Sequence, residues 1–252
     1  YAKKSHGNIF PTRFIIEPFS KSQMIWLFLM LKNLNAIMET VKYKRGATDV
    51  SKNYEKLSET YYDYQAKKFD RSFDGFLSGF FKRYILKNLD LPDQAKVLEV
   101  GAATGRLLKM LASQQQFEGI GLDISSQMTQ FAQTQYPEFS FVTGSAMQLP
   151  FEDQSFDVLI CSASFHHFPI PETFLKEARR VLKSGGKLVI AEIRIPIFHG
   201  LYNSYIKRFS KEGDVKVYTF DELQALLETA GFVLIKGRRH LQIQYFEANK
   251  KA

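Results

Sequence analysis

The stretch Val97-Leu-Glu-Val-Gly-Ala-Ala-Thr-Gly105 decides the fold of this chain. Its apolar first half reads as a short strand, which leads through Glu99 into a turn of small residues. Apolar residues then follow at helical spacing, at Leu107, Leu108 and Leu111. A glycine turn between a strand and a helix lets backbone N–H groups approach a nucleotide-like ligand. The stretch therefore predicts a strand–turn–helix unit that binds such a ligand.

Two familiar nucleotide-binding turns do not match this sequence. The dinucleotide fingerprint G-x-G-x-x-G requires glycine at positions 103 and 106, where this chain has Ala103 and Arg106. The phosphate-binding P-loop requires a Gly-Lys-Ser/Thr ending, which this turn lacks. The remaining pattern, an acid followed by Gly, a small residue and Gly, favours a ligand without a pyrophosphate.

Composition limits the classes of function. The chain has 252 residues, 45% of them hydrophobic, and a net charge of +8, which suits one large domain or a domain with an appendage. Its single cysteine, Cys161, excludes a disulfide framework and a multi-cysteine metal site. The adjacent residues His166 and His167 are expected to diverge, so no metal site is predicted. Basic residues are in excess before residue 51 and after residue 193, as in a solvated surface or one that attracts anions.

The first fifty residues differ from the rest. The apolar run Met24–Leu31 is shorter than the roughly 20 residues of a membrane span, and no signal-peptide cleavage site follows it. We predict that residues 1–50 form a helical extension that serves as a lid, a dimer contact or a substrate element. Residues 51–252 would form the main domain of a cytoplasmic protein without a membrane span.

Strands and helices alternate after residue 95. Residues 51–89 are predicted to be helical and to end at the Asp90-Leu-Pro-Asp93 segment. Strands are expected at Lys96–Val100, Gly119–Asp123, Phe139–Thr143, Asp157–Ser162 and Lys187–Ile193. Helices are expected at Gly105–Ser113, Ser126–Tyr136 and Pro171–Leu182, the last closed by Gly185-Gly186. This alternation predicts an α/β fold with a doubly wound parallel sheet.

Ligands of such sheets bind beyond the carboxyl ends of the strands. Besides the turn at 101–105, two strand ends carry informative residues. Asp123 lies 22 residues beyond Gly101, where an acid can accept hydrogen bonds from ribose hydroxyls; alternatively, it caps the helix that follows. The segment Gly144–Phe151 is a turn placed where an adenine ring would lie. Together the three turns predict a site for an adenosine-containing ligand.

An ordered set of segments resembles the class I S-adenosylmethionine-dependent methyltransferases, in the broad group that includes the ubiquinone/menaquinone-biosynthesis enzymes (methyltransferase type 11 domain). The matching segments are VLEVGAATG (97–105), GIGLDISSQM (119–128), GSAMQLPFEDQSFDVLICSASFHHF (144–168) and EARRVLKSGGKLVIAEI (177–193). The resemblance implies a Rossmann-like, seven-stranded sheet with an antiparallel last strand. A capping box at Thr219–Glu222 and closing strands near 232–237 and 242–248 fit this ending.

The resemblance also implies the residues that bind S-adenosyl-L-methionine and release S-adenosyl-L-homocysteine. Glu99, Gly101, Ala103 and Gly105 belong to the turn beside the methionine part. Asp123 would bind the ribose, and Ile124, Ala146 and Met147 would surround the adenine. Ser162 would lie near the amino-acid end, and Phe69 would close over the cofactor. Two positions depart from the family pattern. Ala103 replaces a glycine, which is tolerable if its φ is negative, and Ser145 replaces the usual aspartate at the adenine amine.

A general base for an oxygen or nitrogen acceptor would come from His166 or His167, which follow the fourth strand. The alternative is that one of them is a structural histidine. Cys161 is interpreted as a buried strand residue rather than a nucleophile.

The predicted activity is transfer of a methyl group to a small, apolar or aromatic acceptor by in-line displacement. Two alternatives stay open: methylation of RNA or protein, which the basic flanks would suit, and S-adenosylmethionine binding without catalysis. Acceptor specificity in this family lies in the N-terminal helices and after the fifth strand, here residues 1–90 and 194–217. A homodimer could form through the N-terminal helix. The sequence does not identify the acceptor.

Overall fold

The computed structural model describes residues 53–251, which alternate between strands and helices as the sequence predicts. The strands are β1 (Lys96–Val100), β2 (Glu118–Asp123), β3 (Ser140–Thr143), β4 (Phe156–Ser162), β5 (Leu182–Ile193), β6 (Phe232–His240) and β7 (Ile243–Lys250). The helices are α2 (Tyr54–Gln65), η1 (Ala66–Arg71), α3 (Phe73–Asn88), α4 (Arg106–Ala112), α5 (Ser126–Gln135), η2 (Phe165–His167), α6 (Pro171–Val181), α7 (His199–Phe209) and α8 (Phe220–Thr229). The proposed extension at 1–50, with its apolar run, lies outside the described residues.

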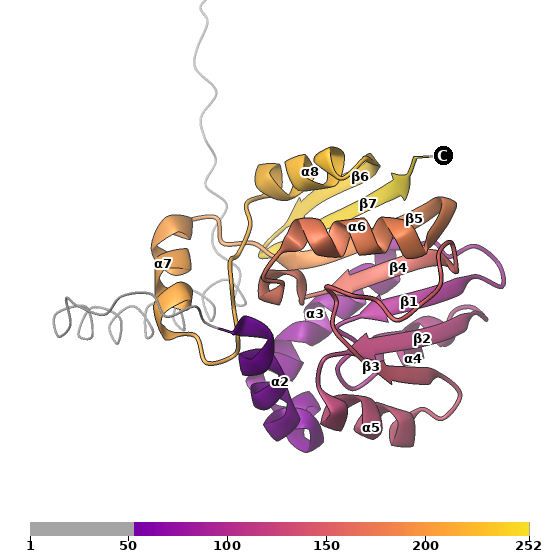
Figure 1. The fold of residues 1–252 in the computed structure, drawn as a ribbon, viewed down its shortest axis with the longest axis horizontal. Coiled ribbons are helices and arrows are strands. Elements are labelled where there is room, and N and C mark those ends of the chain that lie inside the picture. The colour runs from indigo at the N-terminus through magenta and orange to yellow at the C-terminus, as the bar shows by residue number, and fades with distance from the viewer. Residues whose placement is uncertain (1–52, 252) are drawn as a thin grey trace, which may run out of the picture. The chain divides into compact units, whose positions relative to one another are not determined.

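One sheet organises the domain (Figure 1). Its strand order is β3-β2-β1-β4-β5-β7-β6. Neighbours from β3 to β5 are parallel, whereas β7 runs antiparallel to both β5 and β6. The predicted doubly wound α/β fold with an antiparallel last strand is therefore confirmed. Among the described residues, no helix is long and apolar enough to cross a membrane.

Both faces of the sheet are covered (Figure 1). Leu98 and Val100 of β1 belong to the apolar cluster that contains α6 and α8. Val97, which precedes Leu98, belongs to the cluster formed with α3 and α4. Because side chains alternate along a strand, Glu99 shares the face of Val97, toward α3 and α4.

The helical segment predicted over residues 51–89 is interrupted. Ser72 has extended backbone, and its hydroxyl accepts a hydrogen bond from the backbone N–H of Gly75 at 3.1 Å. The chain thus ends η1 and caps α3 at one residue. A Cβ at Gly75 would lie 2.0 Å from the backbone oxygen of Phe69. The tight approach of η1 to α3 therefore requires a glycine at position 75. The spacing of apolar residues gives no indication of this requirement.

The junction between α6 and β5 also differs from the prediction. Helix α6 ends at Val181, and Leu182 is already extended and paired with Phe156. The pairing register then jumps to Lys187 opposite Val158. Gly185-Gly186, expected to close the helix, instead lies within β5 in the segment that this jump leaves unpaired. Gly185 has a φ of 74°, which glycine adopts without strain.

The closing elements match their prediction closely. Thr219 caps α8, and the carboxylate of Glu222 accepts a hydrogen bond from the backbone N–H of Thr219, which completes the capping box. The strands β6 and β7 follow, near the predicted positions.

We predict that Phe174→Ala lowers the free energy of unfolding by about 3–5 kcal/mol, the usual cost of deleting a buried aromatic ring. Phe174 of α6 is fully buried and packs on Phe165 and Phe168, with ring centroids at 5.8 and 4.6 Å. Ile235→Ala, at a side chain 58% exposed on β6, is the control and should cost under about 1 kcal/mol. Urea unfolding measures both, and equal losses would contradict the assigned core.

Candidate functional site

The turn after β1 has an unusual backbone. Gly101, Ala103 and Gly105 all have positive φ, at 76°, 47° and 74°. Ala103 thus does not meet the condition of a negative φ under which an alanine was considered tolerable here. Its left-handed conformation carries a steric cost for a residue with a Cβ, and its backbone N–H donates to Oδ2 of Asp123 at 2.8 Å. A Cβ at Gly101 would lie 2.2 Å from Oγ of Ser164, so only glycine fits there.

Asp123 connects the first two turns. Its Oδ2 accepts from Ala103, and its Oδ1 accepts from the backbone N–H of Ser125 at 2.9 Å. Burial raises the pKa of this carboxyl, and these backbone donors oppose that rise. The alternative role as a helix cap falls to Ser125, whose hydroxyl accepts from the backbone N–H of Met128 at 3.0 Å. Each oxygen of Asp123 keeps acceptor capacity for a ligand.

A pocket opens beside these turns at the carboxyl ends of the strands. It encloses about 790 Å³ of empty space, its open mouth included. Most of the predicted cofactor-binding residues line it: Phe69, Gly101, Ala103, Asp123, Ile124, Ala146, Met147 and Ser162. The other three, Glu99, Gly105 and Ser145, are not among its lining residues. Figure 1 shows α2 near the same end of the sheet.

Sequence reasoning missed one wall of the pocket, which comes from α2. Glu55, Ser58 and Tyr62 line the pocket and follow one another at helical spacing, so they share one face of α2. The helix is held to α5 through Asp63, whose Oδ1 accepts from the hydroxyl of Ser125 at 2.6 Å. Ser145 of the third turn donates a hydrogen bond to Oε1 of Glu55. Polar residues at helical spacing were the available signal.

A second missed residue is Lys82 of α3, which lines the pocket although it is only 3% exposed. Burial lowers its pKa, while the charge of Glu99 opposes the shift. Glu99 is fully buried, and neither of its oxygens has a hydrogen-bond partner among the described residues. Burial raises the pKa of Glu99 to about 8 against the opposing charge of Lys82. The pair thus places a buried lysine in the pocket lining and a buried acid just outside it.

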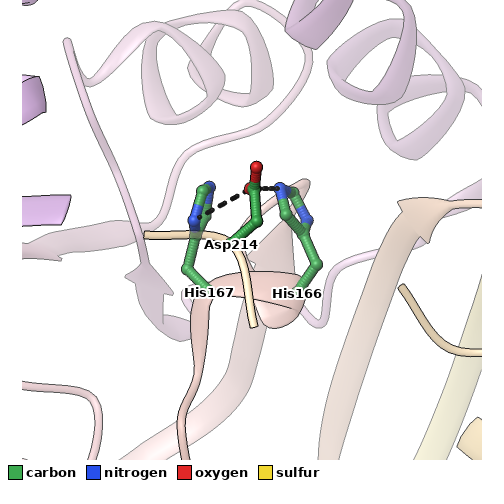
Figure 2. Close-up of side chains that lie close together, drawn as sticks. All are labelled: His166, His167 and Asp214. Atoms are coloured by element: carbon green, nitrogen blue, oxygen red, sulfur yellow. Dashed lines mark ion pairs between the residues drawn. The ribbon is translucent and has the colours of Figure 1, made fainter. Parts of the chain in front are cut away.

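The two adjacent histidines converge on Asp214 (Figure 2). Nδ1 of His167 and Nε2 of His166 lie 3.3 and 3.5 Å from Oδ1 of Asp214. The prediction that the rings diverge was wrong, because they lie on the short helix η2 with centroids only 4.1 Å apart. Ligand atoms of the three side chains lie within 4.8 Å of one another, close enough to share a metal ion. His166 is already paired with Glu192, whereas Nδ1 of His167 has no hydrogen-bond partner among the described residues.

His166 is held as a cation. Its Nδ1 lies 2.8 Å from Oε1 of Glu192, a carboxylate without exposed surface. Burial alone would lower the pKa of His166, but the charges of Glu192, Asp214 and Glu212 outweigh burial and raise it to about 9. An imidazolium has no lone pair for a metal or for a substrate proton. His166 is also absent from the pocket lining.

His167 has the opposite character and does line the pocket. Burial and the charge of His166 lower its pKa to about 4, so the ring is neutral at pH 7. Its Nε2 lies 3.0 Å from the hydroxyl of Tyr62. Burial holds the pKa of Tyr62 well above its ordinary value, so Tyr62 stays protonated. With Asp214 beside Nδ1, the ring is oriented to accept at Nε2.

Asp214 and Glu212, which sequence reasoning also missed, come from the segment after β5. That segment is fixed by backbone N–H groups of Val215 and Lys216, which donate to the backbone oxygen of His166 at 2.9 and 3.2 Å. Burial and the charge of Asp214 raise the pKa of Glu212 to about 7. Cys161 is fully buried in β4, in agreement with its interpretation as a strand residue.

Known proteins resemble this chain in sequence and in fold. A family described as "Methyltransferase domain" matches residues 98–190. A demethylmenaquinone methyltransferase of Paenarthrobacter aurescens is 30% identical over 180 residues, which cover 66% of this chain and 71% of that protein. The chain belongs to the class I S-adenosylmethionine-dependent methyltransferases. It is therefore a methyltransferase enzyme of this class.

Other similarities agree with this family. A demethylmenaquinone methyltransferase of Thermotoga maritima is 40% identical over 119 residues, which cover 44% of this chain and 51% of that protein. The matched segment thus spans about half the length of that relative. A solved S-adenosylmethionine-dependent methyltransferase from Aquifex aeolicus superposes with a TM-score of 0.60 at 21% identity, and the match covers 75% of this chain and 98% of that one. At this identity, the structure supports the fold of the methyltransferase.

We predict that His166 makes the stability of the methyltransferase depend on pH. Its pKa of about 9 in the folded state exceeds its ordinary value of 6.5. The added stability is therefore complete below about pH 6.5 and disappears as the pH rises through about 9, with a total of about 3 kcal/mol.

Urea unfolding from pH 6 to 10 would measure this effect. The stability gap between wild type and His166→Gln should narrow as the pH rises. His240→Gln, at an exposed position at the end of β6, controls for the loss of a histidine. A gap of constant size would contradict the assigned charge of His166.

Proposed function

We propose that the pocket binds S-adenosylmethionine and that the enzyme transfers its methyl group to a small, apolar or aromatic acceptor by in-line displacement. The observation that carries this proposal is the convergence of four strand ends, those of β1 to β4, on one pocket. Asp123 at the end of β2 holds the turn after β1 by a hydrogen bond of 2.8 Å to Ala103. The turn at Gly144–Met147 and Ser162 of β4 complete the same wall.

Unpartnered polar groups support this ligand. The oxygens of Glu99 and Oγ of Ser162 are buried without hydrogen-bond partners among the described residues. Buried polar groups normally have hydrogen-bond partners. We therefore propose that these atoms form hydrogen bonds to a bound ligand. The amino-acid end of S-adenosylmethionine carries an ammonium and a carboxylate. Lys82 would face that carboxylate, and the ammonium would favour the ionised form of the nearby Glu99, whose pKa burial raises to about 8.

The remaining contacts follow the chemistry of each residue. Asp123 would accept hydrogen bonds from the ribose hydroxyls, because both of its oxygens keep free lone pairs. Ile124 and Met147 would pack on the adenine, and the backbone of Ala146 would contact its edge. Phe69 would cover the cofactor from η1. Gly105 would act indirectly, since a Cβ there would lie 2.5 Å from Phe141 and displace the turn.

Methyl transfer requires little covalent chemistry from the protein. The cofactor supplies the electrophilic methyl group on its sulfonium. The walls must exclude water and align the acceptor atom with the carbon–sulfur bond, since alignment supplies much of the acceleration. Phe168 and Pro169 give the pocket apolar surface beside His167. This surface suits an apolar or aromatic acceptor.

His167 is the residue that we propose as the general base. It is neutral at pH 7 and contacts the pocket, whereas His166 is charged and lies off the lining. The hydrogen bond between Tyr62 and Nε2 of His167 links the pocket to the base. In this relay, Tyr62 gives its hydroxyl proton to Nε2 of His167 and takes the proton of the acceptor in its place. Asp214 beside Nδ1 would stabilise the imidazolium that results.

The acceptor class follows from the relatives and from the wall. The relatives above are named as demethylmenaquinone methyltransferases, and a hydroxylated aromatic ring of that kind has both an apolar body and a removable proton. We therefore propose such a ring as the acceptor. Methylation of RNA or protein would give products different from a methylated ring. Binding without transfer would give no methylated product.

We predict that Asp123→Ala lowers the affinity for S-adenosylhomocysteine at least about 100-fold, because it removes a charged acceptor from the ribose and releases the turn at Ala103. Calorimetric titration measures the affinity. Asp93→Ala, in the exposed loop before β1, is the matched control and should bind as wild type does. Unchanged binding by Asp123→Ala would show that the cofactor lies elsewhere.

We predict that His167→Ala lowers kcat about 10²–10⁴-fold, the range for loss of a general base, with little change in cofactor affinity. Tyr62→Phe should lower kcat as well but less, since His167 stays in place. Methyl transfer would be followed with a panel of hydroxylated aromatic acceptors, and His240→Asn would serve as the control. Full activity of His167→Ala would exclude it as the base.

A further inference from the structure

We propose that Glu55 of α2 recognises the exocyclic amine of the adenine ring, a role that the family gives to an aspartate at the position of Ser145. This inference rests on the proposed function, because it assumes that S-adenosylmethionine occupies the pocket. The observation behind it is that Glu55 lines the pocket and accepts a hydrogen bond from the hydroxyl of Ser145. The carboxylate of Glu55 thus lies beside Ser145, the position of the family aspartate.

Ser145 alone is a poor partner for the amine. Oγ of Ser145 donates its proton in a hydrogen bond to Oε1 of Glu55. Oγ of Ser145 also accepts a hydrogen bond from the backbone N–H of Met147 at 2.9 Å. One lone pair of a neutral hydroxyl remains. The second oxygen of Glu55, Oε2, has no hydrogen-bond partner among the described residues. A carboxylate oxygen is the stronger acceptor, because hydrogen bonds to charged groups are stronger than those between neutral groups.

The surroundings place Glu55 at the adenine end. Gly144, Ala146 and Met147, which flank Ser145 in the sequence, line the pocket together with Ile124 and Glu55. These residues form the apolar slot that we assign to the adenine. A side chain that contacts Ser145 and lines this slot lies at its edge, where the amine would point.

Helix α2 is positioned firmly enough to give Glu55 a defined place. Asn53 caps the helix by accepting from the backbone N–H of Lys56 at 3.0 Å. Asp63 near its other end accepts from the hydroxyl of Ser125 at 2.6 Å. Glu55 and Tyr62 are separated by seven residues, or roughly 10 Å along a helix axis. One rigid element therefore carries the adenine contact at one end and the partner of His167 at the other.

The test compares two ligands that differ only at the amine. S-adenosylhomocysteine and its 6-deamino analogue, in which hydrogen replaces the amine, are titrated calorimetrically into the full chain. Wild type should prefer S-adenosylhomocysteine by about tenfold or more, as a charged hydrogen bond would give. Glu55→Ala should lose most of this preference while its affinity for the 6-deamino analogue stays near that of wild type.

Two further variants make the test specific. Glu59→Ala removes an acid one turn further along α2, outside the pocket lining, and should keep the wild-type preference. Glu55→Ala combined with Ser145→Asp restores an acid at the third turn and should regain the preference. That recovery would not occur if Glu55 only held α2 in place.

The outcomes separate the two proposals. If Glu55→Ala keeps the full preference for S-adenosylhomocysteine, the role of Glu55 is wrong while the proposed cofactor stands. If wild type binds neither ligand, the proposed function fails, and the role of Glu55 fails with it. If wild type binds both ligands equally, no residue reads the amine and the inference is also overturned.

Discussion

The site depends on one carboxylate, that of Asp123. It accepts hydrogen bonds from two backbone N–H groups, at Ala103 in the first turn and Ser125 before α5. These bonds hold a non-glycine residue in a left-handed conformation at a φ of 47°, which would otherwise cost free energy. The residue expected to bind the ribose thus also shapes the turn expected to approach the methionine part. The carboxylate of Asp123 thus holds the backbone of the pocket in place and is also expected to bind the ligand.

Much of the fold could be predicted because its signals are local. The boundaries of β1 were predicted to the residue, and the capping box of α8 was legible as Thr219 followed by Glu222. Errors arose where tertiary contacts decide the backbone. The break at Ser72 depends on the approach of η1 to Gly75, and the entry into β5 depends on pairing with β4. Neither contact leaves a periodic pattern in the sequence.

The residues of the candidate site likewise fall into two groups, those that could be predicted from the sequence and those that could not. Residues at the ends of strands, such as Gly101 and Asp123, could be placed on the pocket because the fold determines where strand ends lie. The contributions of α2, α3 and the segment after β5 could not, because they depend on how distant segments pack over the sheet. Lys82 is an example, since a lysine in an amphipathic helix normally faces solvent. Its burial beside Glu99 depends on tertiary structure alone.

The segment after β5 has two tasks at once. It contributes Asp214 and Glu212, whose charges act on the histidines, and it belongs to the region that the family resemblance leads us to expect to set acceptor specificity. A change of acceptor that alters this segment would therefore also alter the protonation of the proposed base. Substrate range and optimum pH would diverge together among relatives. An enzyme of this design could not easily exchange one substrate for another without readjusting its proton chemistry.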